Sequence, residues 1–172
     1  MATHTIFRSP TRVAKTVLLV CQANTCRSVM AQALLEKMLA ERGFDARIRV
    51  RSGGIGPHAR DGMIPSLDAR LVLREEGIRL AEDTILSTDL NAHGELLTGA
   101  DLILTMTEEQ KRVVRARLNG TDAAVYTLGE FADVDGDIRD PVGQDEARYR
   151  AARDEIKRRL EGSLERLLRL LA

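Results

Sequence analysis

Two patterns of apolar and polar residues alternate along the chain. Residues 17–20 and 102–104 are short apolar runs without a polar interruption, which is typical of strands buried on both faces of a sheet. From Ser28 onward, apolar residues recur with the period of a helix as far as Gly43, a residue type common at helix C-termini. The pattern therefore predicts a chain of alternating strands and helices.

The same criteria assign the remaining elements. Thr107 and Gln110 have the spacing of a capping box, which predicts the start of a helix. Strands are expected at residues 17–20, 46–51, 102–104 and 124–126, helices at 28–43, 64–76, 90–97, from 107 onward and at 145–170, a turn at 52–54 and a long loop at 129–144. This order predicts a single-domain α/β fold, a three-layer sandwich around a central, mainly parallel four-stranded sheet with flavodoxin-like winding.

Length and composition predict one folded domain behind a short leader. A chain of 172 residues, 44% of them hydrophobic, can bury a core without disulfides or metals. Residues 1–15 show no apolar period and contain Pro10, so we expect a disordered leader, with an export or mitochondrial address as the alternative. Residues 16–172 then form the domain.

The charge balance excludes several classes of partner. Lys+Arg and Asp+Glu both total 26, which argues against binding nucleic acid or an anionic membrane through bulk charge. No apolar run approaches the ~20 residues of a membrane helix. Residues 1–51 nevertheless carry an excess of basic side chains, so this third is either an anion-binding region or an ordinary solvated surface.

The cysteines and histidines give no sign of a disulfide framework or a metal site. The two cysteines, Cys21 and Cys26, are too few and too close together for the disulfide framework of a secreted domain, and we expect a cytoplasmic protein. The histidines are scattered, and no Cys/His set has zinc spacing. No metal or cofactor is therefore predicted.

The loop from Cys21 to Ser28 joins the first strand to the first helix. At the carboxyl end of a strand in an open α/β sheet, backbone N–H groups can converge on an anion. These dipoles and Arg27 favour the thiolate of Cys21, a nucleophile that would face a bound phosphate. The guanidinium of Arg27 can hold two phosphate oxygens, and Ser28 either caps the helix or hydrogen-bonds the thiolate.

The residues around this loop resemble a known family. Residues 17–35, V-L-L-V-C-Q-A-N-T-C-R-S-V-M-A-Q-A-L-L, are similar to the signature of the low-molecular-weight phosphotyrosine protein phosphatases, as are R-S-G at 51–53, A-D-L-I-L-T-M at 100–106, and Asp140-Pro141 with Gly143 and Tyr149. The resemblance implies a protein phosphatase, monomeric or weakly dimeric, that acts on phosphorylated proteins through a phosphocysteine intermediate.

The same resemblance implies a role for each residue of the site. It makes Cys21 the nucleophile, Arg27 the phosphate clamp and Asp140 the general acid. The residues expected to form or support the phosphate-binding loop are Gln22, Ala23, Asn24, which shapes it, Thr25, Cys26 and Ser28, which supports the thiolate.

Two positions depart from the family pattern. Ala23 stands where the family usually has glycine, and Val29 where it usually has proline. Glycine in a phosphate loop often permits a positive φ or a close approach of the ligand, so Ala23 is expected to strain or reshape the loop. Proline in the first helical turn only preorganises φ, so Val29 is expected to matter less.

The loop at residues 129–144 offers several carboxylates for the general acid. Asp133, Asp135, Asp137 and Asp140 all lie in it, and spacing alone does not choose among them. Pro141 pushes the backbone of Asp140 toward an extended geometry. Together with the resemblance, this favours Asp140, with Asp137 as the second candidate and an ordinary polar turn as the alternative.

Cys26 lies in the same loop as the nucleophile. The resemblance implies that family members with this pair form a reversible disulfide, which here would join Cys21 to Cys26 and protect the nucleophile from further oxidation. The alternative is a thiol that packs at the base of the helix.

Thr25 and Val142 bear on the choice of substrate. Tyrosine-directed relatives commonly carry an aliphatic residue at the position of Thr25, whereas a subgroup that removes phosphate from arginine side chains resembles N-T-C-R-S at residues 24–28. Val142 replaces the aromatic residue that tyrosine-directed members carry after Asp-Pro, but the arginine subgroup tends to carry one too. Phosphoarginine is favoured and phosphotyrosine stays open. A non-catalytic phosphate-binding module, or an arsenate reductase dependent on an external thiol, are alternatives of other classes.

Overall fold

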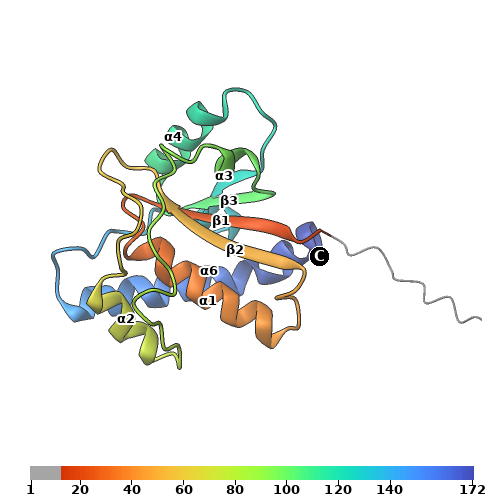
Figure 1. Ribbon diagram of the computed structural model, residues 1–172. Helices are drawn as coiled ribbons and strands as arrows, with labels where there is room; N and C mark the ends of the chain where they lie inside the picture. Colours follow the sequence, from red (N-terminus) through yellow and green to blue (C-terminus); the bar gives the residue numbers. More distant parts are fainter. Residues whose placement is uncertain (1–12) are drawn as a thin grey trace, which may run out of the picture.

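The computed structural model describes residues 13–172 and contains one parallel sheet (Figure 1). Its strands are β1 (Lys15–Cys21), β2 (Ile48–Gly54), β3 (Leu102–Thr105) and β4 (Val125–Thr127), in the order β2-β1-β3-β4. The predicted three-layer fold with a central four-stranded sheet is confirmed, and every strand pair is parallel.

Helices cover both faces of the sheet (Figure 1). The long helices α1 (Arg27–Glu41) and α6 (Glu146–Leu171) lie on one face, while α3 (Glu95–Thr98) and α4 (Glu108–Leu118) lie on the other. This division follows from the alternation of side chains along β1. Val17 and Leu19 belong to the core beneath α1 and α6, whereas Leu18 and Val20 belong to the core on the opposite face.

Two shorter helices complete the layer that contains α6. Helix α2 (Leu67–Arg74) packs against both α1 and α6, and α5 (Leu128–Phe131) follows β4 directly. Within residues 13–172, no helix combines the length and the apolar character that a membrane span requires.

Several predicted boundaries were wrong. The helix expected at 64–76 begins only at Leu67, because the ψ of Ser66, 145°, is not helical and its hydroxyl accepts from the Ala69 N–H as an N-cap. The helix expected at 90–97 is reduced to α3. The loop expected at 129–144 starts inside α5, where Thr127 and Glu130 form a capping box.

The C-terminal bound of the expected leader and the expected turn were wrong. Of the predicted leader, residues 1–12 lie outside the described residues, and Lys15 already belongs to β1, where its N–H donates to the Arg47 carbonyl at 2.9 Å. The turn expected at 52–54 is the end of β2. A Cβ on Gly53 would lie 2.5 Å from Leu90 Cγ, so glycine is needed here for close packing and not for a turn.

The end of β2 holds the loop that follows β1. The N–H groups of Ile55 and Gly56 donate to the carbonyls of Cys21 and Gln22 at 3.0 and 2.9 Å. A Cβ on Gly54 would lie 2.8 Å from the Gln22 oxygen. The backbone after Cys21 is thus held closely against β2, at the carboxyl edge of the sheet.

Candidate active site

Cys21 is the last residue of β1 and lies at the carboxyl edge of the sheet, as predicted. Its side chain is buried, and α1 begins shortly after it, at Arg27. Cys26 occupies the N-cap position of α1 without a side-chain capping bond. Ser28 lies inside the first turn of α1, so the expectation that it could cap the helix was wrong.

Two hydrogen-bond donors meet the sulfur of Cys21. Ser28 Oγ lies 2.9 Å from Cys21 Sγ, and the Asn24 N–H donates to the same sulfur at 3.3 Å. Asn24 Nδ2 donates to Ser28 Oγ at 2.8 Å, which leaves the hydroxyl proton of Ser28 free to point at the sulfur. Donors directed at sulfur stabilise the thiolate over the thiol.

Asn24 organises this arrangement from a left-handed backbone conformation. Its φ is +58° and its side chain is buried. The Thr88 N–H donates to Asn24 Oδ1 at 2.9 Å, and because a backbone N–H can only donate, this contact sets which way the amide points. Nδ2 then donates to Ser28 Oγ and to Ser52 Oγ, the latter at 2.9 Å. Each polar atom of the amide therefore has a partner.

The hydrogen-bond chain continues from Asn24 into α1. The Ser52 hydroxyl donates to Gln32 Oε1 at 2.6 Å, and Gln32 Nε2 donates to Glu36 Oε1 at 2.9 Å. Burial raises the pKa of Glu36, while the Gln32 hydrogen bond opposes that shift. Sequence reasoning assigned no role to Ser52, Gln32 or Thr88, although Ser52 lies in the R-S-G match.

The loop carries no strain at Ala23. The left-handed residue of the loop is Asn24, and the φ of Ala23 lies outside the positive region. Asparagine tolerates this conformation better than most residues because its side chain can hydrogen-bond locally. The strain expected at Ala23 was therefore wrong, and a reshaped loop stays a prediction. Val29 is fully buried in α1, which begins at Arg27 without a proline.

The remaining loop positions differ in exposure. Gln22 is exposed and Thr25 is half-buried. The Thr25 carbonyl accepts from the Ser66 N–H at 2.9 Å, which ties the loop to the start of α2. Thr25 thus lies at the rim of the loop, between the buried residues Asn24 and Cys26.

Arg27 joins this loop to the distant aspartate loop. Its guanidinium is almost fully buried, with Nη1 donating to the Ile138 carbonyl at 2.8 Å and Nη2 lying 3.2 Å from Asp140 Oδ2. The Asp140 side chain remains 43% exposed, so the carboxylate can also reach a ligand. The other oxygen of Asp140 accepts from the Val142 N–H at 3.1 Å, and the Val142 side chain is exposed.

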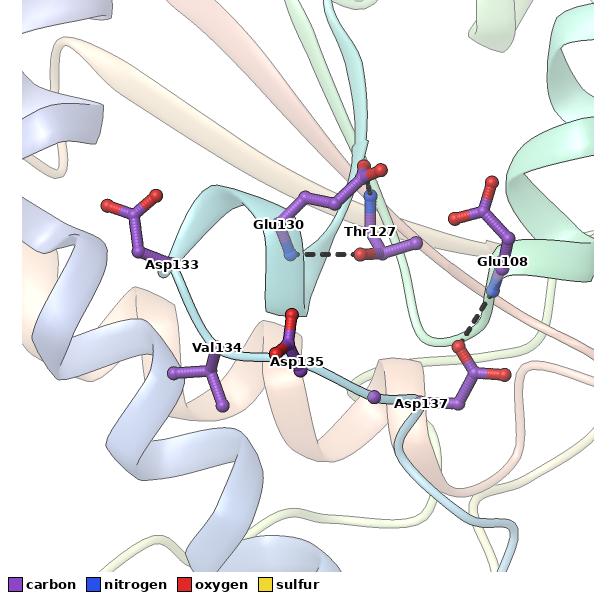
Figure 2. A pocket seen from close by; sticks show the side chains of 8 residues that line it. Glu108, Thr127, Glu130, Asp133, Val134, Asp135 and Asp137 are labelled. Atoms are coloured by element: carbon purple, nitrogen blue, oxygen red, sulfur yellow. Dashed lines mark hydrogen bonds between the residues drawn. The ribbon is translucent and has the colours of Figure 1, made fainter.

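Asp137 has a different partner. Its Oδ1 accepts from the Glu108 N–H at 2.9 Å, at the first turn of α4 (Figure 2). A carboxylate at a helix N-terminus satisfies a free N–H and interacts favourably with the helix dipole. Asp140, and not Asp137, is the aspartate that the structure brings to Arg27.

The two cysteines have different surroundings. Both are free and buried. Burial raises the pKa of the Cys26 thiol, and the negative charges of Cys21 and Asp140 raise it further. Cys26 is therefore held as a neutral thiol, whereas Cys21 Sγ has Ser28 Oγ and the Asn24 N–H as hydrogen-bond partners.

A buried cysteine that meets hydrogen-bond partners at the end of a parallel strand, with an arginine at the start of the next helix, is typical of a cysteine-dependent phosphatase. The family is equally clear. The chain belongs to the low molecular weight phosphotyrosine protein phosphatase family, whose model matches residues 16–170. It is accordingly a protein phosphatase.

Its relatives carry two kinds of name. The chain is 37% identical over 153 residues to a protein-arginine-phosphatase of Geobacillus stearothermophilus, covering 88% of this chain and 95% of the relative. It is 35% identical over 153 residues to a probable low molecular weight protein-tyrosine-phosphatase, EpsP, of Ralstonia solanacearum, covering 89% and 96%. A solved structure of the YwlE arginine phosphatase, a Cys-to-Ser mutant with a phosphorylated active-site serine, is 31% identical with a TM-score of 0.80, covering 90% and 99%.

Proposed function

We propose that this phosphatase works through a phosphocysteine at Cys21 and prefers phosphoarginine side chains of proteins. The observation that carries the proposal is the convergence on Cys21 Sγ of Ser28 Oγ at 2.9 Å and the Asn24 N–H at 3.3 Å. A relative whose active-site cysteine is replaced by a serine holds a phosphate on that serine, which supports a covalent phosphoenzyme.

The first step transfers the phosphoryl group to sulfur. The thiolate of Cys21 attacks phosphorus while the bond from phosphorus to the substrate nitrogen or oxygen breaks. Arg27 and the backbone N–H groups of the loop hold the equatorial oxygens as the transition state forms. Asp140, in its protonated form, gives its proton to the departing atom. For a phosphoarginine, that atom is a guanidine nitrogen.

The second step releases phosphate. Asp140, now a carboxylate, takes a proton from a water molecule that attacks phosphorus, and the S–P bond breaks. The leaving group of this step is the thiolate of Cys21, which the Ser28 hydroxyl stabilises at 2.9 Å. Both steps therefore use groups that the structure gathers around one sulfur and one guanidinium.

Thr25 supports the preference for phosphoarginine. It places a hydroxyl at the half-buried rim of the loop, where it can hydrogen-bond polar surroundings of the phosphate that an aliphatic residue cannot. Two relatives, at 37% and 33% identity, are named protein-arginine-phosphatases. The exposed Val142 beside Asp140 offers no aromatic wall for a phenyl ring. Phosphotyrosine is the second candidate, because other relatives are named tyrosine phosphatases.

The substrate assignment is tested by competing substrates. We expect kcat/KM to be higher for phosphoarginine peptides than for phosphotyrosine and phosphoserine peptides of the same sequence. Thr25→Ile should move the ratio toward phosphotyrosine, while the matched control Thr25→Ser, which keeps the hydroxyl, should leave it nearly unchanged. An unchanged ratio in Thr25→Ile would reject the role of Thr25.

The catalytic assignment has its own test. Cys21→Ser should lose turnover of p-nitrophenyl phosphate yet still bind phosphate or vanadate, because Arg27 and the loop N–H groups remain. Cys26→Ser makes the same change at the other cysteine of the loop and should keep most of the turnover. Retained turnover in Cys21→Ser would exclude a phosphocysteine.

A further inference from the structure

The loop that carries Asp140 is irregular backbone beside an open hollow. Figure 2 shows this loop from Asp133 to Asp137 as it crosses below α5. The hollow has a volume of about 720 Å³, and Val134 is exposed beside it. Val134 therefore does not anchor the loop on this side, and before the buried Ile138 its 133–137 segment is held by polar contacts.

Arg159 supplies the first of these contacts from α6. Its side chain is 4% exposed. Nη1 donates to the Gly136 carbonyl at 2.7 Å and Nη2 lies within 3.4 Å of the Asp135 carbonyl. Glu155, one helical turn earlier, pairs with Nη2 at 2.5 Å and balances the buried charge. The buried guanidinium of Arg159 thus hydrogen-bonds two successive carbonyl groups of the loop.

Asp137 supplies the second contact on the opposite side. Its carboxylate accepts the Glu108 N–H at the start of α4, and the next residue, Ile138, is fully buried with its N–H donating to the Met106 carbonyl at 3.0 Å. The loop is therefore held between α6 and α4 just before it reaches Arg27.

The close approach of Arg159 and the loop to α5 leaves no room for a side chain at position 129. A Cβ on Gly129 of α5 would lie 2.6 Å from the Val134 oxygen and 2.8 Å from Arg159 Nη1. Glycine is needed there so that the loop can approach α5 while the guanidinium enters between them. These contacts fix the distance between the loop and α5 in the structure.

That position decides where Asp140 lies. Asp140 follows Asp137 closely in the chain, and the intervening Ile138 carbonyl accepts from Arg27. General acid catalysis needs the carboxyl group within hydrogen-bond reach of the departing atom, and an error of about 1 Å can cost about 100-fold in rate.

We propose that Arg159 is a positioning residue for catalysis: it holds the 133–137 segment so that Asp140 meets the leaving atom. The inference rests on the proposed role of Asp140 as the general acid. Arg159 touches neither the phosphate loop nor Asp140 through any hydrogen bond of the described residues, so it acts through the loop backbone.

The test compares substrates that differ in their need for a proton. Phenyl phosphate has a poor leaving group that needs the acid, whereas 2,4-dinitrophenyl phosphate has a good one that does not. We expect Arg159→Met to lower kcat/KM at least about ten-fold for phenyl phosphate and less than about two-fold for the dinitrophenyl ester. Arg159→Lys should restore part of the loss, and Arg158→Met, on the exposed face of the same helix, should change neither.

Repeating the measurement in an Asp140→Asn variant distinguishes a failure of the role of Arg159 from a failure of the role of Asp140. In Asp140→Asn, which lacks the acid, adding Arg159→Met should cause no further loss for phenyl phosphate. Equal losses for both substrates, or a further loss in the Asp140→Asn background, would overturn the role of Arg159. If Asp140→Asn itself spares phenyl phosphate, the role of Asp140 fails instead. Should Arg159→Met not fold, Arg159→Gln, which keeps a long polar side chain without the guanidinium, carries the same leaving-group comparison.

Discussion

Replacing Ser28 by alanine tests how the protein stabilises its sulfur. The substitution removes the hydroxyl that lies 2.9 Å from Cys21 Sγ and leaves the Asn24 N–H at 3.3 Å as the remaining donor. It also removes the acceptor of Asn24 Nδ2, whose other hydrogen still has Ser52 Oγ at 2.9 Å. The variant therefore affects both the stabilisation of the sulfur and the hydrogen bonds that hold the loop.

The two effects have different sizes. A hydrogen bond to a charged group contributes about 1.5–3 kcal/mol, which corresponds to about 10- to 150-fold in a rate that depends on that charge. The unpaired N–H of Asn24 costs about 1–3 kcal/mol of folding free energy. Because the thiolate is the leaving group when phosphocysteine is hydrolysed, the rate loss should fall on that second step.

A stopped-flow assay with p-nitrophenyl phosphate separates the steps. We expect Ser28→Ala to release one equivalent of nitrophenolate in a burst, followed by a steady state slowed about 10- to 150-fold. Ser163→Ala is a matched control, because Ser163 is also buried but donates within α6 to the Arg159 carbonyl at 2.7 Å. If Ser28→Ala kept the original steady state, its hydroxyl would not be stabilising the sulfur.

The second thiol and two ion pairs give three further predictions. After peroxide, Cys26→Ser should regain less activity with dithiothreitol than the unchanged protein, and equal recovery would remove the protective role of Cys26. The hydrogen bond with Asp61 raises the pKa of His93, so His93 stabilises the fold fully below about pH 6.5 and loses this contribution as pH rises through the raised pKa. His93→Gln should lower Tm at about pH 6 more than at about pH 8, and an equal loss at both would contradict this. Hydrogen bonds from Arg150 and Arg153 lower the pKa of Glu75 to about 2. Glu75 therefore contributes to folding stability above about pH 4.5, and this contribution is lost as pH falls toward 2. Glu75→Gln should therefore cost stability at about pH 7 that disappears near pH 2, as thermal melts at both pH values would show.

Much of the fold and the centre of the site could be predicted because their signals are local. The apolar runs in β1 and β3 and the helical period of α1 place the loop at Cys21 between a strand and a helix, and Arg27 follows within the same loop. The end of β2 was misread, because Gly53 signals a turn in the sequence. Its real cause is the packing of Leu90, whose Cγ would lie 2.5 Å from a Cβ at this position.

The sequence does not choose between Asp137 and Asp140 as the proposed general acid. Asp137 and Asp140 lie close together in one loop, and nothing in their spacing separates them. In the folded chain one carboxylate accepts from the start of α4 and the other lies 3.2 Å from Arg27 Nη2. The strain expected at Ala23 was likewise wrong, because the backbone geometry places the positive φ at Asn24.

Local signals were enough to predict the α/β fold and to single out the loop from Cys21 to Ser28 with its cysteine and arginine, because hydrophobic periodicity and a short motif act between near neighbours. Which distant groups reach this loop depends on how the whole chain packs. Asn24 bonds Ser52 and Thr88 through one hydrogen bond each, and Arg159 bonds two carbonyl groups of the loop before Asp140, in each case between segments far apart in the chain. Such contacts leave no periodic trace, since they depend on where the packed strands and helices bring each polar atom.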